Sequence, residues 1–189
     1  MNKIERILRI SQLCGNCIRF LAYYRAGNNI KDKHKNGVQI QFWIAVSNGL
    51  LNMSVLEWCK LFCEEEGKHF WKKGVEDEGE FKNNLFKLAV MKGGEAEFDK
   101  YKKEIREYRD KYVAHLDLVT SGRIPKFDIM KETTIFLYDY LHSHMYKDGG
   151  VEYECKTNVE IRKLYDDALE EGKKIYDNID EQYLFKSTS

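Results

Sequence analysis

Only one proline, Pro125, interrupts the chain of 189 residues. Proline removes a backbone donor and clashes with the preceding helical turn, so its near-absence permits long helices. Apolar residues recur at helical spacing along most of the chain, and no segment alternates with the period of two that is typical of strands. We therefore predict an all-α fold, an antiparallel bundle of about six helices joined by short connections.

The apolar periodicity also predicts where the helices lie. They are expected at residues 3–26, 38–64, about 81–93, 95–116, 127–147 and from about 157 onward. The second is apolar on most sides and is expected to be the central, most buried helix. The third should end at Gly93–Gly94, and the last should begin at a capping box of Thr157 and Glu160, with Gly172 as a weak point. We predict a single domain over 1–189, with 150–189 as a C-terminal helical extension.

Charge and cysteine content limit the classes of protein to consider. The 31 basic residues balance 31 acidic ones, which argues against coating nucleic acid by bulk electrostatics but leaves room for a local basic site. No apolar run reaches the ~18 residues of a membrane span, and the N-terminus lacks the features of a signal peptide. The odd number of cysteines, five, fits free thiols in a reducing cytoplasm. We expect a cytoplasmic protein without a membrane partner.

One charged residue occupies an unexpected position in the predicted helix 95–116. In a projection at about 100° per residue, Arg109 lies about 20° from Phe98, near the middle of the apolar stripe. An arginine that is buried without a partner costs several kcal/mol, so Arg109 must meet a carboxylate, carbonyl groups, a ligand or a wet crevice. His115 lies roughly 120° around from Arg109. A purely structural interpretation stays open, in which Arg109 extends past the stripe to water and His115 ends the helix.

The segment "YRDKYVAHLD" resembles the R-(x4–6)-H motif of the HEPN superfamily (higher eukaryotes and prokaryotes nucleotide-binding), whose members are all-α and usually dimeric. It is most similar to the branch found in prokaryotic abortive-infection and toxin systems, where a phrase R-[DN]-K-x-x-A-H-x-D recurs. In this sequence the phrase is filled by Arg109, Asp110, Lys111, Ala114, His115 and Asp117. "LEWCKLF" resembles the central helix of that branch and "KHFWKK" its connector, so the resemblance covers about residues 3–147.

The resemblance implies an antiparallel bundle of the HEPN type that cleaves RNA without a metal. Two protomers would bring their R…H segments together at a two-fold axis, with RNA in the cleft between them. The implied partners are a second copy of the chain, RNA as the substrate, and an antitoxin or other neutralising protein. Other members of the superfamily have lost catalysis, so a non-catalytic module for dimerisation and for binding a partner or nucleotide is the alternative.

The chemistry of the two motif residues suits this reaction. Metal-independent cleavage uses the 2′-hydroxyl of RNA as the nucleophile, which requires a proton acceptor, a proton donor and positive charge near the phosphorus. Histidine in general titrates near neutrality, so His115 is the candidate general acid and base, and Arg109 is the candidate clamp on the phosphate. Supporting or RNA-binding side chains are expected at Asp110, Lys111, Tyr112 and Asp117. No cofactor and no metal ligand is expected.

Two cysteine pairs suggest a different kind of site. Cys14-x-x-Cys17 and Cys59-x3-Cys63 would each place two thiols on one helical face, as in a four-thiolate zinc site of a helical adaptor protein. Each pair, however, continues an apolar stripe, and cysteine packs well as a small buried hydrophobe. We therefore predict that these thiols are free and do not bind zinc.

Overall fold

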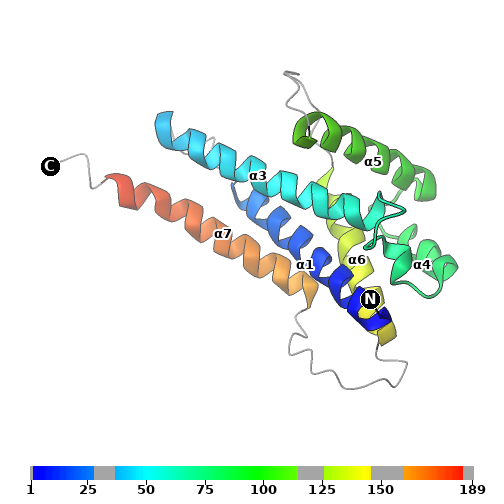
Figure 1. The fold of residues 1–189 in the computed structure, drawn as a ribbon. Coiled ribbons are helices and arrows are strands. Elements are labelled where there is room, and N and C mark those ends of the chain that lie inside the picture. The colour runs from blue at the N-terminus through cyan, green and yellow to red at the C-terminus, as the bar shows by residue number, and fades with distance from the viewer. Residues whose placement is uncertain (1, 28–36, 115–125, 146–159, 185–189) are drawn as a thin grey trace.

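Every regular element that the structure describes is helical, as predicted (Figure 1). The computed structural model describes residues 2–27, 37–114, 126–145 and 160–184, and the side chains within them except at 37–41, 113–114, 145 and 178–184. The α-helices are α1 (Lys3–Gly27), α3 (Gly37–Phe62), α4 (Glu78–Leu85), α5 (Gly94–Tyr108), α6 (Phe127–Met145) and α7 (Ile161–Leu184). A 3-10 turn, η1 (Trp71–Lys73), precedes α4, and a π-helical turn, η2 (Arg109–Ala114), follows α5.

The first helix, α1, is the centre of the bundle. It packs against α3, α6 and α7, and Figure 1 shows it between α3 and α7. The colours show that α3 runs antiparallel to α1, whereas α7 runs in the same direction as α1. The prediction that residues 38–64 form the central helix was therefore wrong, because α1 is the helix with neighbours on several sides.

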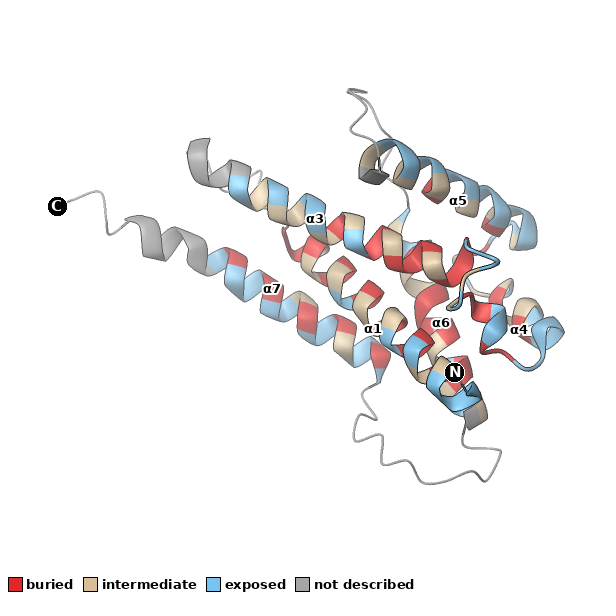
Figure 2. Cartoon of the chain, viewed as in Figure 1, coloured by how far each residue is buried: buried red, intermediate tan, exposed pale blue. Residues whose placement is uncertain are grey.

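The two halves of α3 have different surroundings. From Leu51 onward most of its side chains are buried, and Val55 and Trp58 are completely enclosed. The preceding half is equally apolar but more open (Figure 2), and Phe42 there is 62% exposed. Apolar composition alone predicted burial on most sides, yet burial also requires a neighbouring element, which the first half of α3 largely lacks. Despite this apolar helix, none of the described helices is long and apolar enough to cross a membrane.

Two glycines allow α1 and α7 to approach closely. A Cβ atom on Gly172 of α7 would lie 2.7 Å from Cβ of Ala26, and one on Gly27 of α1 would lie 2.8 Å from the Tyr176 ring. Real Cβ atoms do not approach other atoms so closely. Gly172 is thus a position of close packing, rather than the weak point that we predicted.

Helix limits agree with the sequence predictions for α1 and α6 and differ for α4. Asp77 caps α4, its side chain accepting a hydrogen bond from the Glu80 amide at 2.8 Å, but the helix ends at Leu85 instead of continuing to Gly93. Gly94 has φ of +59°, a left-handed conformation that suits glycine, and it begins α5. Of the predicted capping box, Thr157 lies outside the described residues.

The core where α3, α5 and α6 meet is built around Trp58. Its ring packs against Phe62 and Tyr101, with centroids 5.0 Å and 5.2 Å away. Its indole N–H donates a 3.0 Å hydrogen bond to Oγ1 of Thr133 on α6. Burying an indole N–H without an acceptor costs stability, so this bond satisfies Trp58 and links α3 to α6.

His142 gives the fold a dependence on pH. Its half-buried ring stacks on Tyr138 at 4.1 Å, and burial lowers the pKa of His142. Below the ordinary pKa of about 6.5 the unfolded chain therefore takes up a proton that the folded chain resists, and stability falls as pH falls toward the folded-state pKa. His142→Phe should reduce the loss of unfolding free energy between neutral pH and about pH 5, as measured by urea unfolding at each pH. An unchanged pH dependence in this variant would contradict the assignment.

Candidate functional site

The backbone changes its helical form at the first residue of the motif. The apolar stripe of α5, formed by Phe98, Tyr101 and Ile105, is buried as predicted, and α5 ends at Tyr108. The next residue, Arg109, begins the π-helical turn η2, which extends to Ala114. The Arg109 amide still bonds to the carbonyl of Ile105 at α-helical spacing, so the α-helical projection holds for Arg109 but not for the rest of the turn, where a π-helix bonds residue i to i+5. Single π-helical turns are rare and occur frequently at functional sites.

Arg109 meets carboxylates, one of the outcomes that its position predicted. Its Nε donates to Oδ1 of Asp110 at 2.9 Å, and its Nη1 lies 3.6 Å from Oε1 of Glu64. The side chain is 24% exposed, so the guanidinium is partly sheltered but still reaches solvent. Partial burial acts to lower the pKa of Arg109, but the bond to Asp110 and nearby negative charges, including Glu64, outweigh it and raise the pKa. The arginine is thus fixed in its charged form.

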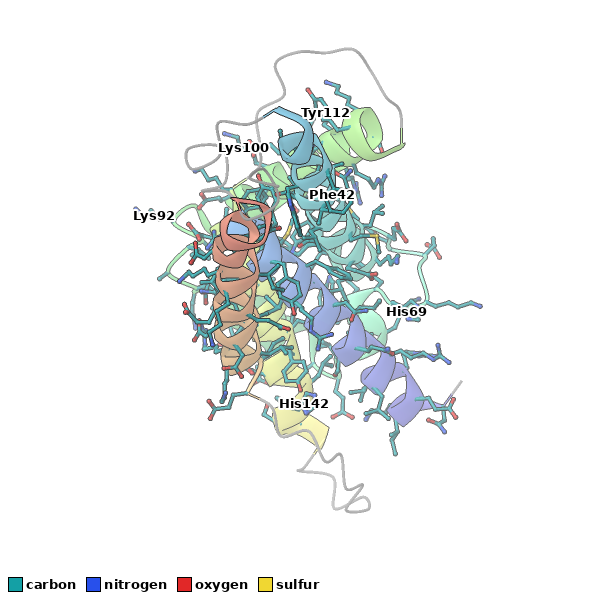
Figure 3. The ribbon with its side chains drawn as sticks, turned by 90° about the vertical axis from the view of Figure 1, so that its left-hand side faces the viewer. Phe42, His69, Lys92, Lys100, Tyr112 and His142 are labelled. Atoms are coloured by element: carbon teal, nitrogen blue, oxygen red, sulfur yellow. The ribbon has the colours of Figure 1, made fainter. Side chains whose placement is uncertain are left out.

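The three residues after Arg109 lie on the outer side of the turn. Asp110 is exposed and orients the Arg109 guanidinium through the hydrogen bond just described. Lys111 is exposed to solvent. Tyr112 is partly exposed, and its ring lies 5.1 Å from that of Tyr108 at an interplanar angle of 35°. In Figure 3 Tyr112 lies at one end of the molecule and His142 at the other.

His115 and Asp117 lie outside the described residues. The structure therefore brings together Arg109, Asp110 and the neighbouring Lys111 and Tyr112, and it leaves the predicted partnership of Arg109 with His115 as a prediction. The catalytic roles of Arg109 and His115 likewise remain predictions.

The sequence did not indicate which residues lie behind Arg109. Glu64 comes from a connector with three consecutive glutamates, and nothing in the pattern distinguished it from Glu65 or Glu66. Arg106, one turn before the motif, donates from Nη2 to the backbone carbonyl of Cys63. The end of α3 is thereby tied to the end of α5, and this connection holds Glu64 beside Arg109.

The four cysteines that the structure describes lie in two environments. Cys14 and Cys17 lie fully buried in α1, where the Cys17 thiol contacts Ser54 and Thr134. Cys59 and Cys63 lie at the end of α3, near α5. All four thiols are free. In the described part of the chain no group of three or more His, Cys, Asp and Glu side chains is arranged to hold a metal ion.

Comparisons of the chain with models of protein families, with curated proteins and with solved structures gave no match. The case for a function therefore rests on the geometry around Arg109 and on the sequence of its motif.

Proposed function

We propose that this protein is a metal-independent endoribonuclease of a prokaryotic defence or toxin system, acting in the cytoplasm as a homodimer. The observation that carries the proposal is the placement of Arg109. A permanently charged guanidinium sits partly exposed at the start of a π-helical turn, in a segment that resembles the R-(x4–6)-H motif of HEPN ribonucleases. A neutralising partner protein belongs to the same proposal.

The contacts of Arg109 suit a residue that exchanges partners. Glu64 is 47% exposed and lies 3.6 Å away, a loose surface ion pair whose contribution to stability is only about 0–1 kcal/mol. A phosphate oxygen offers the same charge-assisted bonding and can replace Glu64 at little cost. Asp110, held at 2.9 Å, would stay in place and keep the guanidinium directed at the scissile phosphate. Arg109 would then stabilise the negative charge that develops there in the transition state.

His115 supplies the proton transfers in this proposal. As a general base it takes the proton from the 2′-hydroxyl, and as a general acid the imidazolium gives a proton to the departing 5′-oxygen. Because the 2′-hydroxyl is the nucleophile, the reaction needs no metal-bound water. The product strand would end in a 2′,3′-cyclic phosphate.

The surface of α5 favours a short, local contact with RNA. Lys100, Lys103 and Lys111 are exposed, but acidic residues are as frequent as basic ones between Glu95 and Tyr112. A face of mixed charge attracts the phosphate backbone of RNA only weakly from a distance. Binding would therefore depend on Arg109 and on an RNA base that stacks on Tyr112. Two protomers related by a two-fold axis would double these contacts in one cleft.

The pairing of Arg109 also favours a second candidate function. Its guanidinium is already satisfied by Asp110 and Glu64, which is the state expected when the charge serves only to hold α3 and α5 together. In that case the chain is a non-catalytic module that dimerises and binds a partner or nucleotide.

The two functions are separated by the His115→Ala variant. If the proposal holds, this variant should cleave a labelled RNA about 10²–10⁴-fold more slowly than the wild type, the usual contribution of a general acid–base group. His144→Ala is the matched control, because it removes an imidazole from α6 outside the motif, and it should retain activity. Equal cleavage rates in wild type and His115→Ala would rule out the catalytic role, and circular dichroism would check the fold of both variants.

A further inference from the structure

The second cysteine pair lies one helical turn apart where α3 ends. The amide of Cys63 donates to the carbonyl of Cys59 at 2.8 Å, so the helical backbone continues between them although α3 formally ends at Phe62. Residues four apart in a helix share a face. The two thiols are therefore neighbours at the end of the helix. Cys63 is 4% exposed and directly precedes Glu64, which is exposed to solvent.

Three cations of α5 and η2 act on this pair of thiols. Lys102, Arg106 and Arg109 follow one another at intervals of four and three residues, which places them on one helical face. Arg106 is bonded to the Cys63 carbonyl. The hydrogen bond from Cys59 lowers the pKa of Cys63, and the charges of Arg106 and Lys102 lower it further against the opposing effect of burial. The same hydrogen bond, together with burial, raises the pKa of Cys59. The surroundings therefore favour the charged form of Cys63 over that of Cys59.

The first cysteine pair shows the opposite behaviour within the same chain. Cys14 and Cys17 are fully buried among apolar side chains of α1. Burial raises the pKa of Cys14, and it raises the pKa of Cys17 to about 11. Thiols of this kind are inert, whereas reactive thiols lie close to solvent beside positive charge. The chain thus contains an internal reference for any measurement on Cys63.

We propose that Cys59 and Cys63 form a peroxide-sensitive dithiol, in which Cys63 is the attacking thiolate and Cys59 the resolving thiol. The Cys63 sulfur attacks one peroxide oxygen, the O–O bond breaks, and the sulfur is oxidised by two electrons to a sulfenic acid while the other oxygen leaves as hydroxide and is protonated to water. The Cys59 sulfur then attacks the Cys63 sulfur. The S–O bond breaks, the Cys59 proton leaves with the hydroxyl group as water, and a disulfide remains.

Formation of the disulfide changes the backbone beside Arg109. In a helix, Cβ atoms four residues apart are about 5–6 Å from each other. A disulfide needs about 3.5–4.5 Å. The backbone at Cys63 must therefore leave its helical conformation to bring the two Cβ atoms closer. Cys63 can do so because it lies just beyond the last residue of α3. Glu64 follows directly and lies 3.6 Å from Arg109, so oxidation would move it away and leave the guanidinium with Asp110 alone.

The first test is the rate of alkylation of each cysteine in the native protein, followed by peptide mass spectrometry. Cys155 is replaced by serine throughout, so that only the four described thiols compete. At neutral pH Cys63 should react at least about tenfold faster than Cys14 or Cys17, since the thiolate is the reactive species. Arg106→Gln should slow Cys63 by several-fold, whereas Arg162→Gln, on the distant surface of α7, should not. Equal rates at Cys63, Cys14 and Cys17 would overturn the proposal.

The second test is oxidation with a small excess of hydrogen peroxide. The wild-type pair should yield a Cys59–Cys63 peptide that has lost the mass of two hydrogen atoms. Cys59→Ala should leave a sulfenic acid at Cys63 that a dimedone probe captures, whereas Cys63→Ala should leave Cys59 reduced. Oxidation of Cys59 in the Cys63→Ala variant, or of Cys14 and Cys17 at the same rate as Cys63, would contradict the assignment. These measurements follow covalent changes at cysteine and need no ribonuclease activity. The dithiol proposal can therefore fail while the ribonuclease proposal holds, and the reverse.

Discussion

Arg109→Met should lower the rate of RNA cleavage by about 10²–10³-fold, the effect of removing one preorganised donor from a developing negative charge. Methionine is an unbranched side chain of about the length of the aliphatic part of arginine, and it removes only the guanidinium and its charge. The two carboxylates that lose their partner, Glu64 and Asp110, are 47% and 58% exposed and stay hydrated. The free energy of unfolding should therefore change by no more than about 1 kcal/mol. Single-turnover cleavage and urea unfolding measure the two quantities.

Arg162→Met is the matched control for this substitution. Arg162 is 57% exposed on α7 and pairs with Glu132 at 3.0 Å, so the variant removes the same charge and a comparable ion pair away from the motif. It should cleave RNA at the rate of the wild type. Arg109→Lys separates charge from geometry, because lysine keeps the charge but cannot form the forked contact with phosphate. Full activity of Arg109→Met would remove Arg109 from the catalytic site.

Trp58→Ala should lower the free energy of unfolding by about 3–5 kcal/mol, a large share of the stability of a typical domain. The side chain is completely buried. Its removal leaves a cavity between Phe62, Phe98 and Tyr101, and it takes away the hydrogen-bond donor to Thr133. Trp58→Phe keeps most of the ring volume and loses the donor, so it should cost less than half as much. Urea unfolding monitored by circular dichroism measures both losses.

Trp43→Ala tests whether burial, rather than residue type, sets this cost. Trp43 lies on the same helix in its open half, and its ring packs on Tyr176 with a centroid separation of 5.4 Å. Because the ring is only partly buried, its loss exposes less new apolar surface and should cost clearly less than the loss of Trp58. Equal losses at the two positions would contradict the burial that the structure assigns to them.

The helices could be predicted from the sequence because their apolar stripes are long. The limits of α1 and α6 agree with the prediction to within a few residues, since each stripe ends in a polar segment. The open half of α3 could not be predicted, because the sequence shows that Phe42 is apolar but not that few elements cover it. Gly172 was misjudged for a similar reason. Its lack of a side chain lets α7 pack closely on Ala26 of α1, and the sequence does not show that these two residues meet.

The site could be predicted in part. The position of Arg109 on an apolar stripe indicated that it needs a partner, and Asp110 and Glu64 meet that need. The π-helical turn left no signal, because one turn bonded from residue i to i+5 is too short to establish a period. The identity of Glu64 depends on how α3 and α5 pack. The contact of Arg106 with Cys63 that holds this packing is a tertiary one.

The most direct test of the proposed function is cleavage of a labelled RNA by the wild-type protein in the presence of EDTA, compared with the same strand carrying a 2′-deoxy nucleotide at the cleavage position. The account predicts that the RNA is cut to a 2′,3′-cyclic phosphate without any divalent metal and that the 2′-deoxy strand stays intact at that position. Cleavage that requires a divalent metal, equal cleavage of the 2′-deoxy strand, or no cleavage of any RNA offered would contradict it.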